Sequence, residues 1–181
     1  DFYQVAYPVF REYGIPVTVY LVSGFLDRAL WLWVDQVRYA FRHSPAPGYC
    51  LDLSGHPPRN FELGTIELRK TAAHAVAEAA KKLPNAARLQ LLERLPRELG
   101  VTLPEDAPAE HQPMRWEEAR ELAAAGIELG AHTCTHPVLS RVTSPRELAD
   151  EIAGSKRRIE EQLGRPVDHF CYPNGGSQDF N

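Results

Sequence analysis

Residues 126–137 read GIELGAHTCTHP, and this stretch decides how the rest of the chain is interpreted. Apolar residues alternate with other residues up to Ala131, a period of two that predicts a short β-strand bounded by a glycine and a proline. The strand runs directly into two histidines, His132 and His136. A histidine pair where a strand meets a loop is typical of the active-site face of an α/β barrel.

The spacing of the two histidines suggests a shared ligand. A separation of four residues places two side chains on one face of a helical turn, so we expect a helical turn from His132 that ends at His136, before Pro137. Two imidazoles so placed can bind one metal ion. Seven histidines in 181 residues make such a pair a chance event in roughly one chain in four, so packed or exposed histidines are the alternative. The preceding strand and the hydroxyls of Thr133 and Thr135 favour the metal site.

The composition is that of an ordinary globular domain, with 44% hydrophobic and 24% charged residues. The net charge of −4 argues against a surface for nucleic acid or anionic membranes. No apolar stretch reaches the roughly 20 residues of a membrane helix. The three cysteines, Cys50, Cys134 and Cys171, are too widely spaced for a disulfide framework, and we interpret Cys134 as a packing residue.

Hydrophobic periodicity divides the chain into alternating helices and strands. Helices are expected at residues 2–13, 31–41, 66–82, 86–99, 117–125 and 144–163. Strands are expected at residues 15–22, 49–53, 60–63, 127–131 and 167–172, the second and third of them forming a hairpin. The first strand is almost wholly apolar, which predicts a buried parallel strand. This order predicts a single α/β domain over residues 1–181, with a parallel sheet or barrel, helices outside it and a mostly helical insert at residues 27–113.

Two tryptophans, Trp31 and Trp33, lie at the start of that insert. Flat aromatic faces suit the C–H face of a sugar ring, so the pair could line a sugar groove. Large aromatic side chains more often pack in the core, and we favour that interpretation.

Three stretches of the sequence resemble the polysaccharide deacetylase family, also called carbohydrate esterase family 4 or the nodulation-factor deacetylase homology domain. Residues 14–21, GIPVTVYL, are similar to the family's second strand. Residues 116–137 are similar to its helix, strand and histidine motif, with His132 and His136 at the two metal-ligand positions. Residues 170–175, FCYPNG, resemble its third motif, one wall of the substrate groove.

This resemblance implies a partial, distorted (β/α) barrel with a divalent metal ion, most often zinc, held by two histidines and one aspartate. The family's first motif supplies the aspartate that binds the metal and the aspartate that acts as base, and we expect it upstream of Asp1. We expect the family's late histidine, the general acid, beyond Asn181. The domain is therefore expected to be incomplete at both ends, and the chain to be inactive alone.

The implied reaction is the hydrolysis of N-acetyl or O-acetyl groups on the sugar units of a polysaccharide. The resemblance assigns the backbone N–H of Asn174 to the oxyanion and gives Thr133 a role in orienting the ligand loop. It places Tyr172, Pro173 and Gly175 at the substrate.

Two positions depart from the family pattern. Cys171 replaces an arginine that supports the base, and Asn174 replaces a tyrosine. Two other functions stay open on this scaffold. One is a metal-dependent amidase that acts on small amides, and the other is a glycan-binding relative that has lost catalysis.

Overall fold

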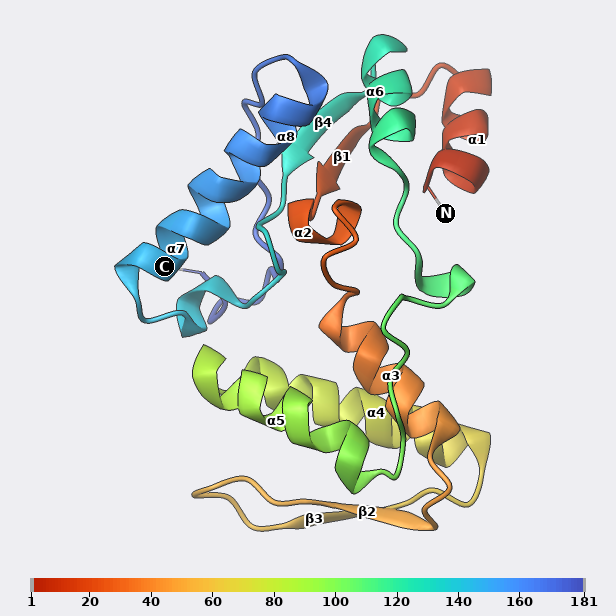
Figure 1. Cartoon of the computed structure of the whole chain (residues 1–181), viewed down its shortest axis with the longest axis vertical. Helices are drawn as coiled ribbons and strands as arrows, with labels where there is room; N and C mark the ends of the chain where they lie inside the picture. The colour runs from red at the N-terminus through yellow and green to blue at the C-terminus, as the bar shows by residue number, and fades with distance from the viewer. Residues whose placement is uncertain (1, 181) are drawn as a thin grey trace. The chain divides into compact units, whose positions relative to one another are not determined.

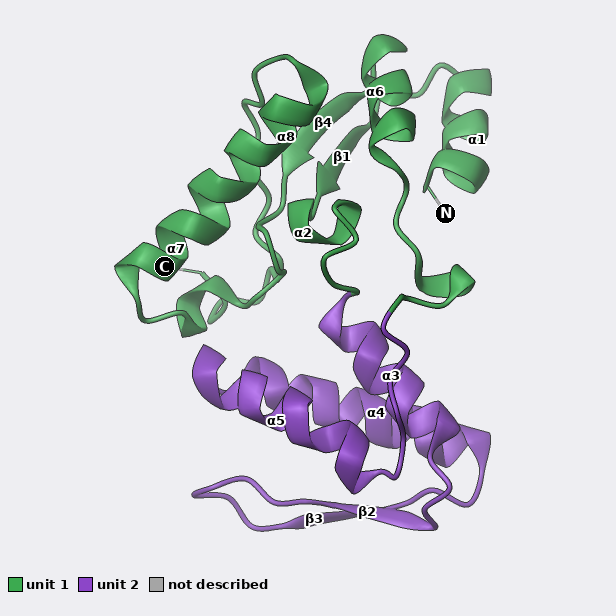
Figure 2. Cartoon of the chain, in the orientation of Figure 1, with its two compact units in different colours: residues 1–31, 106–181 green, residues 32–105 purple. Residues whose placement is uncertain are grey.

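The computed structural model describes residues 2–180 (Figure 1). The chain divides into two compact units (Figure 2). The first unit comprises residues 1–31 and 106–181, and the second comprises residues 32–105. Within residues 2–180, no helix combines the length and apolar character that crossing a membrane requires.

The first unit contains a small parallel sheet and the helices around it. Its strands are β1 (Thr18–Leu21) and β4 (Glu128–Ala131). Its helices are α1 (Tyr7–Glu12), α2 (Ser23–Leu26), α6 (Trp116–Ala124), α7 (Pro145–Ala149) and α8 (Ser155–Leu163). Two π-helical stretches, Phe2–Ala6 and Asp150–Gly154, lead into α1 and α8, and short 3₁₀ turns cover Ala109–His111 and Leu139–Arg141.

Strand β4 lies between two parallel neighbours. It pairs with β1 in a register that sets Leu21 opposite Ala131. On its other side Ala131 forms a parallel bridge with Phe170. The predicted α/β class is therefore confirmed for the described residues, which form an open sheet rather than a closed barrel.

Two predicted strands are shorter than expected. Strand β1 begins only at Thr18, and Ile15 and Tyr20 stay exposed, so the prediction of a buried strand over 15–22 was wrong in extent and in burial. The predicted strand 167–172 is reduced to the bridge at Phe170. Two side chains of α8 explain why residue 167 does not join the sheet. The Val167 N–H donates to Glu160 at 2.9 Å, and Lys156 donates to the Val167 carbonyl. Both backbone groups of Val167 are therefore bonded to side chains and not to a neighbouring strand.

The long helix after the histidines follows its sequence signals closely. Ser144 accepts a hydrogen bond from the Glu147 N–H at 3.3 Å, and Pro145 occupies the first helical position. Gly164 ends α8 in the left-handed conformation with a φ of 68°. The helix predicted over 144–163 is thus confirmed, with a π-helical stretch in its middle.

Helices α6 and α8 both pack on β4 (Figure 1). The core of the first unit is built from the buried apolar residues Leu21, Leu26, Trp116, Ala119, Leu122, Leu129, Ala131, Ile159 and Val167. This core fixes β4, and with it the position of the residues that follow the strand.

The second unit is a hairpin with three helices. Strands β2 (Gly48–Leu51) and β3 (Arg59–Glu62) pair antiparallel, as predicted. The helices are α3 (Trp33–His43), α4 (Ile66–Lys81) and α5 (Asn85–Glu98). The centre of this unit consists of Trp33, Val37, Phe41, Tyr49, Leu51, Leu63, Val76, Leu91, Leu95 and Leu99 with smaller alanines.

The two tryptophans are core residues, as we favoured. Trp31 in the first unit is 5% exposed, and Trp33 in the second is 4% exposed. Trp31 contacts His111, and the guanidinium of Arg88 lies over the ring of Trp33, 5.1 Å from its centroid. Neither ring offers a free face to a sugar, which corrects the alternative of a sugar groove.

The core of the first unit can be tested with a matched pair of isoleucines. Ile159 is 0% exposed and Ile152 is 38% exposed. Ile159→Ala leaves a cavity under the sheet and should lower the free energy of unfolding by about 2–5 kcal/mol. Ile152→Ala should cost less than about 1 kcal/mol. Urea denaturation followed by circular dichroism measures both, and equal losses would contradict this assignment of the core.

Candidate functional site

The side chains of His132 and His136 converge. Their Nε2 atoms lie 3.2 Å apart, and their ring centroids are 4.8 Å apart with an interplanar angle of 72°. The pair follows directly on the last residue of β4, Ala131. Both histidines therefore sit at the carboxyl end of the central strand, the end of a parallel sheet where ligands bind.

The ring of His132 is oriented by both neighbours of β4. Its backbone N–H donates to the Leu21 carbonyl at 3.0 Å, and its Nδ1 lies 2.7 Å from the Cys171 carbonyl oxygen. A carbonyl only accepts, so Nδ1 carries the proton and Nε2 presents a lone pair toward His136. Burial lowers the pKa of His132, although the bond to Cys171 opposes that shift. The ring is therefore held in the neutral form that ligates metals.

The backbone between the histidines is not the helical turn that the spacing suggested. Residues 132–137 form an irregular loop, and Thr133 and His136 have left-handed φ values of 69° and 60°. Pro137 disfavours right-handed helical backbone at His136, which explains part of this departure. The predicted helical turn was wrong, and the two rings meet because the loop folds back on itself.

Thr133 links the two histidines. Its side chain is fully buried, its hydroxyl donates to the His132 carbonyl at 2.5 Å, and the same oxygen accepts the His136 N–H at 3.0 Å. One hydroxyl thus bonds the backbone of both histidines. This contact supports the role in orienting the loop that we expected of Thr133.

Glu151 is the main residue of the site that sequence reasoning missed. It is 7% exposed, and its carboxylate accepts the N–H groups of Cys134 and Thr135 at 2.8 and 2.9 Å and the Thr135 hydroxyl at 2.5 Å. Glu151 lies in the π-helical stretch Asp150–Gly154, more than a dozen residues beyond the loop. Its position in a charged helix gave no sign of this role, because the contact depends on how the helix packs.

Cys134 is the packing residue we expected. Its Sγ lies 3.3 Å from the Asp150 carbonyl oxygen. Burial raises the pKa of its thiol, so the sulfur stays protonated near neutral pH.

Helix α2 satisfies the carbonyl groups of the same loop. The N–H groups of Ser23 and Gly24 donate to the carbonyls of Thr133 and Cys134 at 3.2 and 3.0 Å. A Cβ at Gly24 would lie 2.7 Å from the Cys134 carbonyl oxygen, so only glycine allows this approach. Loop and α2 thus pack as one piece.

Asp27 anchors that piece to two longer helices. It accepts the Trp116 Nε1–H at 2.9 Å and a forked pair of bonds from Arg158, of which the shortest is 2.8 Å. Burial raises the pKa of Asp27, but the hydrogen bonds from Arg158 and Trp116 outweigh it and hold this pKa below its usual value. Asp27 therefore stays ionised and ties α2 to α6 and α8.

The third motif adjoins the histidines through its backbone. Cys171 contributes its carbonyl oxygen to His132, so the residue that replaces the family's arginine contacts the site through its main chain. Pro173 and Asn174 are half-buried in the following loop, and Gly175 is exposed.

Tyr172 belongs to a row of aromatic rings. It is 43% exposed and contacts Phe170 on one side and Phe180 on the other, with centroid distances of 5.5 and 5.6 Å. His169 takes no part in this row, because its Nε2 pairs with Glu128 at the start of β4, 2.9 Å away.

The histidine pair fits a tetrahedral metal ion. Two metal–nitrogen bonds of about 2.0–2.1 Å at a tetrahedral angle place the nitrogens roughly 3.3 Å apart, and the observed Nε2 separation is 3.2 Å. Among residues 2–180 no group of three or more His, Cys, Asp or Glu side chains is arranged to hold a metal. The spacing of the pair is thus compatible with a metal ion, and the described part of the chain adds no third group beside it.

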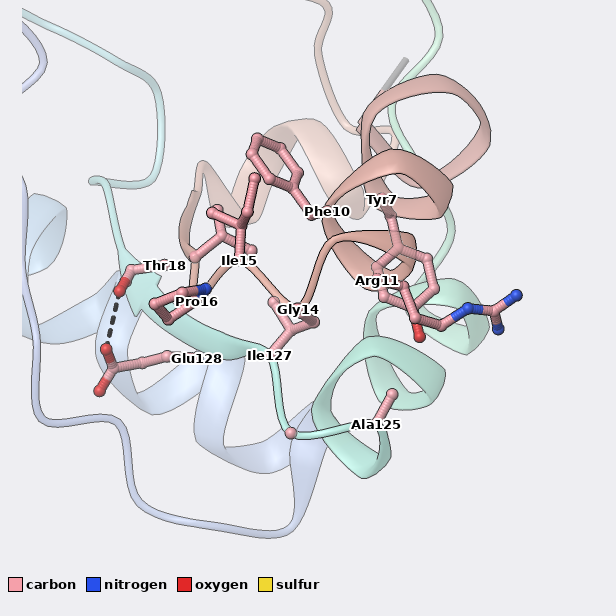
Figure 3. Close-up of a pocket in the computed structure, with 12 residues that line it drawn as sticks. Tyr7, Phe10, Arg11, Gly14, Ile15, Pro16, Thr18, Ala125, Ile127 and Glu128 are labelled. Atoms are coloured by element: carbon pink, nitrogen blue, oxygen red, sulfur yellow. Dashed lines mark hydrogen bonds between the residues drawn. The ribbon is translucent and has the colours of Figure 1, made fainter.

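A cavity of about 470 Å³ in the first unit lies away from this pair (Figure 3). It opens where β1 and β4 begin, at the end of the strands opposite the histidines, and Phe10, Ile15 and Ile127 line it. Thr18 donates to Glu128 at 2.7 Å beside it, and the guanidinium of Arg11 extends away from the other labelled residues in Figure 3. We do not assign the chemistry to this cavity.

The protein is thus an α/β protein with a parallel sheet. Two histidines converge at the carboxyl end of its central strand and form a candidate metal site. The family model described as polysaccharide deacetylase matches residues 67–180. The chain therefore belongs to the polysaccharide deacetylase family, as the resemblance predicted. No curated protein and no solved structure matched the chain.

The matched range begins within α4 and includes half of the segment that we predicted as an insert. It contains the histidine pair, Glu151 and the third motif. Residues 14–21, which we compared with the family's second strand, lie outside it.

The contribution of Glu151 can be measured directly. Glu151→Ala removes the carboxylate that accepts two backbone N–H groups and one hydroxyl, and it should lower the free energy of unfolding by about 2–4 kcal/mol. Hydrogen exchange at the amides of Cys134 and Thr135 should accelerate. Glu12→Ala, at an exposed residue of the same unit, should change stability by less than about 0.5 kcal/mol. Unchanged exchange at both amides in Glu151→Ala would contradict the structure of this loop.

Proposed function

We propose that this protein is a metal-dependent hydrolase that removes acetyl groups from N-acetylated or O-acetylated sugar units of a polysaccharide. The observation that carries the proposal is the 3.2 Å approach of two histidine Nε2 atoms at the end of β4, within the range that matches the polysaccharide deacetylase family. The family supplies the substrate class, and the pair supplies a place for the metal.

His132 and His136 would hold the ion. Neutral imidazole suits zinc among the common divalent ions, and the contact of Nδ1 with the Cys171 carbonyl orients the ring of His132. When bound, such an ion polarises a carbonyl group and lowers the pKa of a coordinated water to about 7. The loop contacts of Thr133 and Glu151 keep both rings at the separation that ligation requires.

The segment after Cys171 would bind the acetylated sugar. The backbone N–H of Asn174 is the proposed donor to the oxyanion of the tetrahedral intermediate, a role that needs about 2.7–3.1 Å to the developing charge. Tyr172, Pro173 and Gly175 would form the adjoining wall. The hydrogen bond from His132 to the Cys171 carbonyl and the bridge from Ala131 to Phe170 support this placement, because they tie the segment to the histidines.

The replacement of arginine by Cys171 removes a side chain that supports the base in the family, but it leaves the orientation of His132 intact. The contact with His132 uses the carbonyl oxygen, which every residue has, so the orientation of the ring is independent of the side chain at this position. The same reasoning applies to Asn174, whose proposed contribution is a backbone N–H. We further propose that the open sheet is part of the distorted (β/α) barrel of the family.

Zinc binding provides the direct test of the metal site. Isothermal titration of the chain with zinc should give one site, and His132→Ala and His136→Ala should each weaken it at least tenfold, because each removes one of two ligands. His169→Ala is the matched control and should bind zinc as the unchanged chain does. Unchanged affinity in both ligand variants would rule out this metal site.

The substrate class needs a separate assay with the complete domain. Release of acetate from N-acetylglucosamine oligomers and from acetylated xylan distinguishes N- from O-deacetylation. Hydrolysis of small cyclic ureides with no acetate release would favour the amidase alternative. Binding of glycans without turnover would favour the glycan-binding relative.

A further inference from the structure

The second unit contains a cavity of about 430 Å³ between the β2–β3 hairpin and α4, which we call the hairpin cavity. All of its lining residues belong to residues 51–83, so it shares no residue with the histidine pair. Its size falls in the range of about 300–1,000 Å³ that is usual for small-molecule sites.

The floor of the hairpin cavity is apolar. It includes Leu51 and Leu53 from the hairpin, Ala79 near the end of α4, and Leu83 just after that helix. Ala75 and Ala79 are four residues apart and lie on one face of α4, where their small side chains leave room that larger residues would fill. The sequence thus creates an apolar depression.

The rim of the hairpin cavity carries an excess of positive charge. Arg59 on β3 and Lys82 after α4 line it as exposed cations, with His74 beside them. The one lining carboxylate, Glu78, is already paired with Lys81 at 2.6 Å. The hydrogen bond from Lys81 holds the pKa of Glu78 below its usual value, and His74 and Lys82 add to this effect. The charge of Glu78 is therefore compensated from outside the cavity.

We propose that the hairpin cavity binds a small anionic amphiphile, whose apolar body lies on the leucine and alanine floor and whose carboxylate or phosphate group meets Arg59 and Lys82. The two parts of the lining require this combination. A purely polar anion would leave the apolar floor exposed to water, and a cationic amphiphile would be repelled by the positive charges at the rim. The proposal is independent of the deacetylase function, because it uses none of that site's residues.

Titration of the complete chain with four probes tests the proposal. Octanoate and octyl phosphate carry both features and distinguish a carboxylate from a phosphate head group, octylamine reverses the charge, and inorganic phosphate lacks the apolar body. In ¹H–¹⁵N spectra, at least one of the two anionic amphiphiles should saturate a site whose shifted amides lie in residues 51–59 and 74–83. Equal binding of octylamine, equal binding of inorganic phosphate, or no saturable binding of either anionic amphiphile would overturn the proposal.

Variants of the rim and the floor separate the two contributions. Arg59→Gln and Lys82→Gln should each weaken binding about two- to fivefold, as expected for exposed charge pairs. Lys70→Gln, on α4 but outside the cavity, should leave it unchanged. Ala79→Leu should fill the floor and weaken binding at least tenfold, while circular dichroism verifies the fold. Should Ala79→Leu fail to fold, unchanged affinity in the Arg59→Gln/Lys82→Gln double variant would still refute the proposal.

Discussion

The loop that carries the histidine pair depends on one buried carboxylate, that of Glu151. Left-handed backbone at non-glycine residues costs about 1–3 kcal/mol each, and the loop contains two such residues, Thr133 and His136. Glu151 offsets this cost by accepting two N–H groups and one hydroxyl from Cys134 and Thr135. Hydrogen bonds to a charged acceptor are about twice as strong as neutral ones, so a single side chain can hold a strained loop.

The sheet determines where this loop begins. β4 is paired on both sides near its end, and His132 receives one hydrogen-bond partner from each side, the Leu21 carbonyl for its N–H and the Cys171 carbonyl for its ring. The end of the strand therefore fixes the ring's rotation as well as its position. Helix α2 in turn donates N–H groups to two carbonyls of the loop. The loop backbone thus has hydrogen-bond partners for both its N–H and its carbonyl groups.

The sequence predicted the elements of this site better than its contacts. Period-two alternation located β4, and the serine, proline and glutamate at 144–147 with Gly164 located the long helix, because these are local signals. The spacing of His132 and His136 correctly predicted that the two rings converge. It did not predict the backbone between them, because both a helical turn and a folded loop can bring side chains four residues apart together. Only the packing of the following helix, through Glu151, decides between them.

Contacts that form only on folding also explain why the strand predicted at residues 167–172 is reduced to one bridge. Residues 167–172 have the composition of a strand, yet the backbone of Val167 is bonded to two side chains of α8, which lie nearby only after folding. Tertiary contacts override strand propensity most easily where a segment is short.

The 3.2 Å contact between the histidines also bears on how a metal would enter. Because His132 donates through Nδ1, its Nε2 can only accept, and the proton between the two rings belongs to Nε2 of His136. Two lone pairs would repel at this distance, so a proton joins the rings in this structure. If an ion bound both nitrogens, as proposed, it would take the place of that proton, and His136 would either release the proton or carry it on Nδ1. Loading of the proposed site would therefore change the protonation or the tautomer of His136, while His132 would keep its Nδ1 proton on the Cys171 carbonyl.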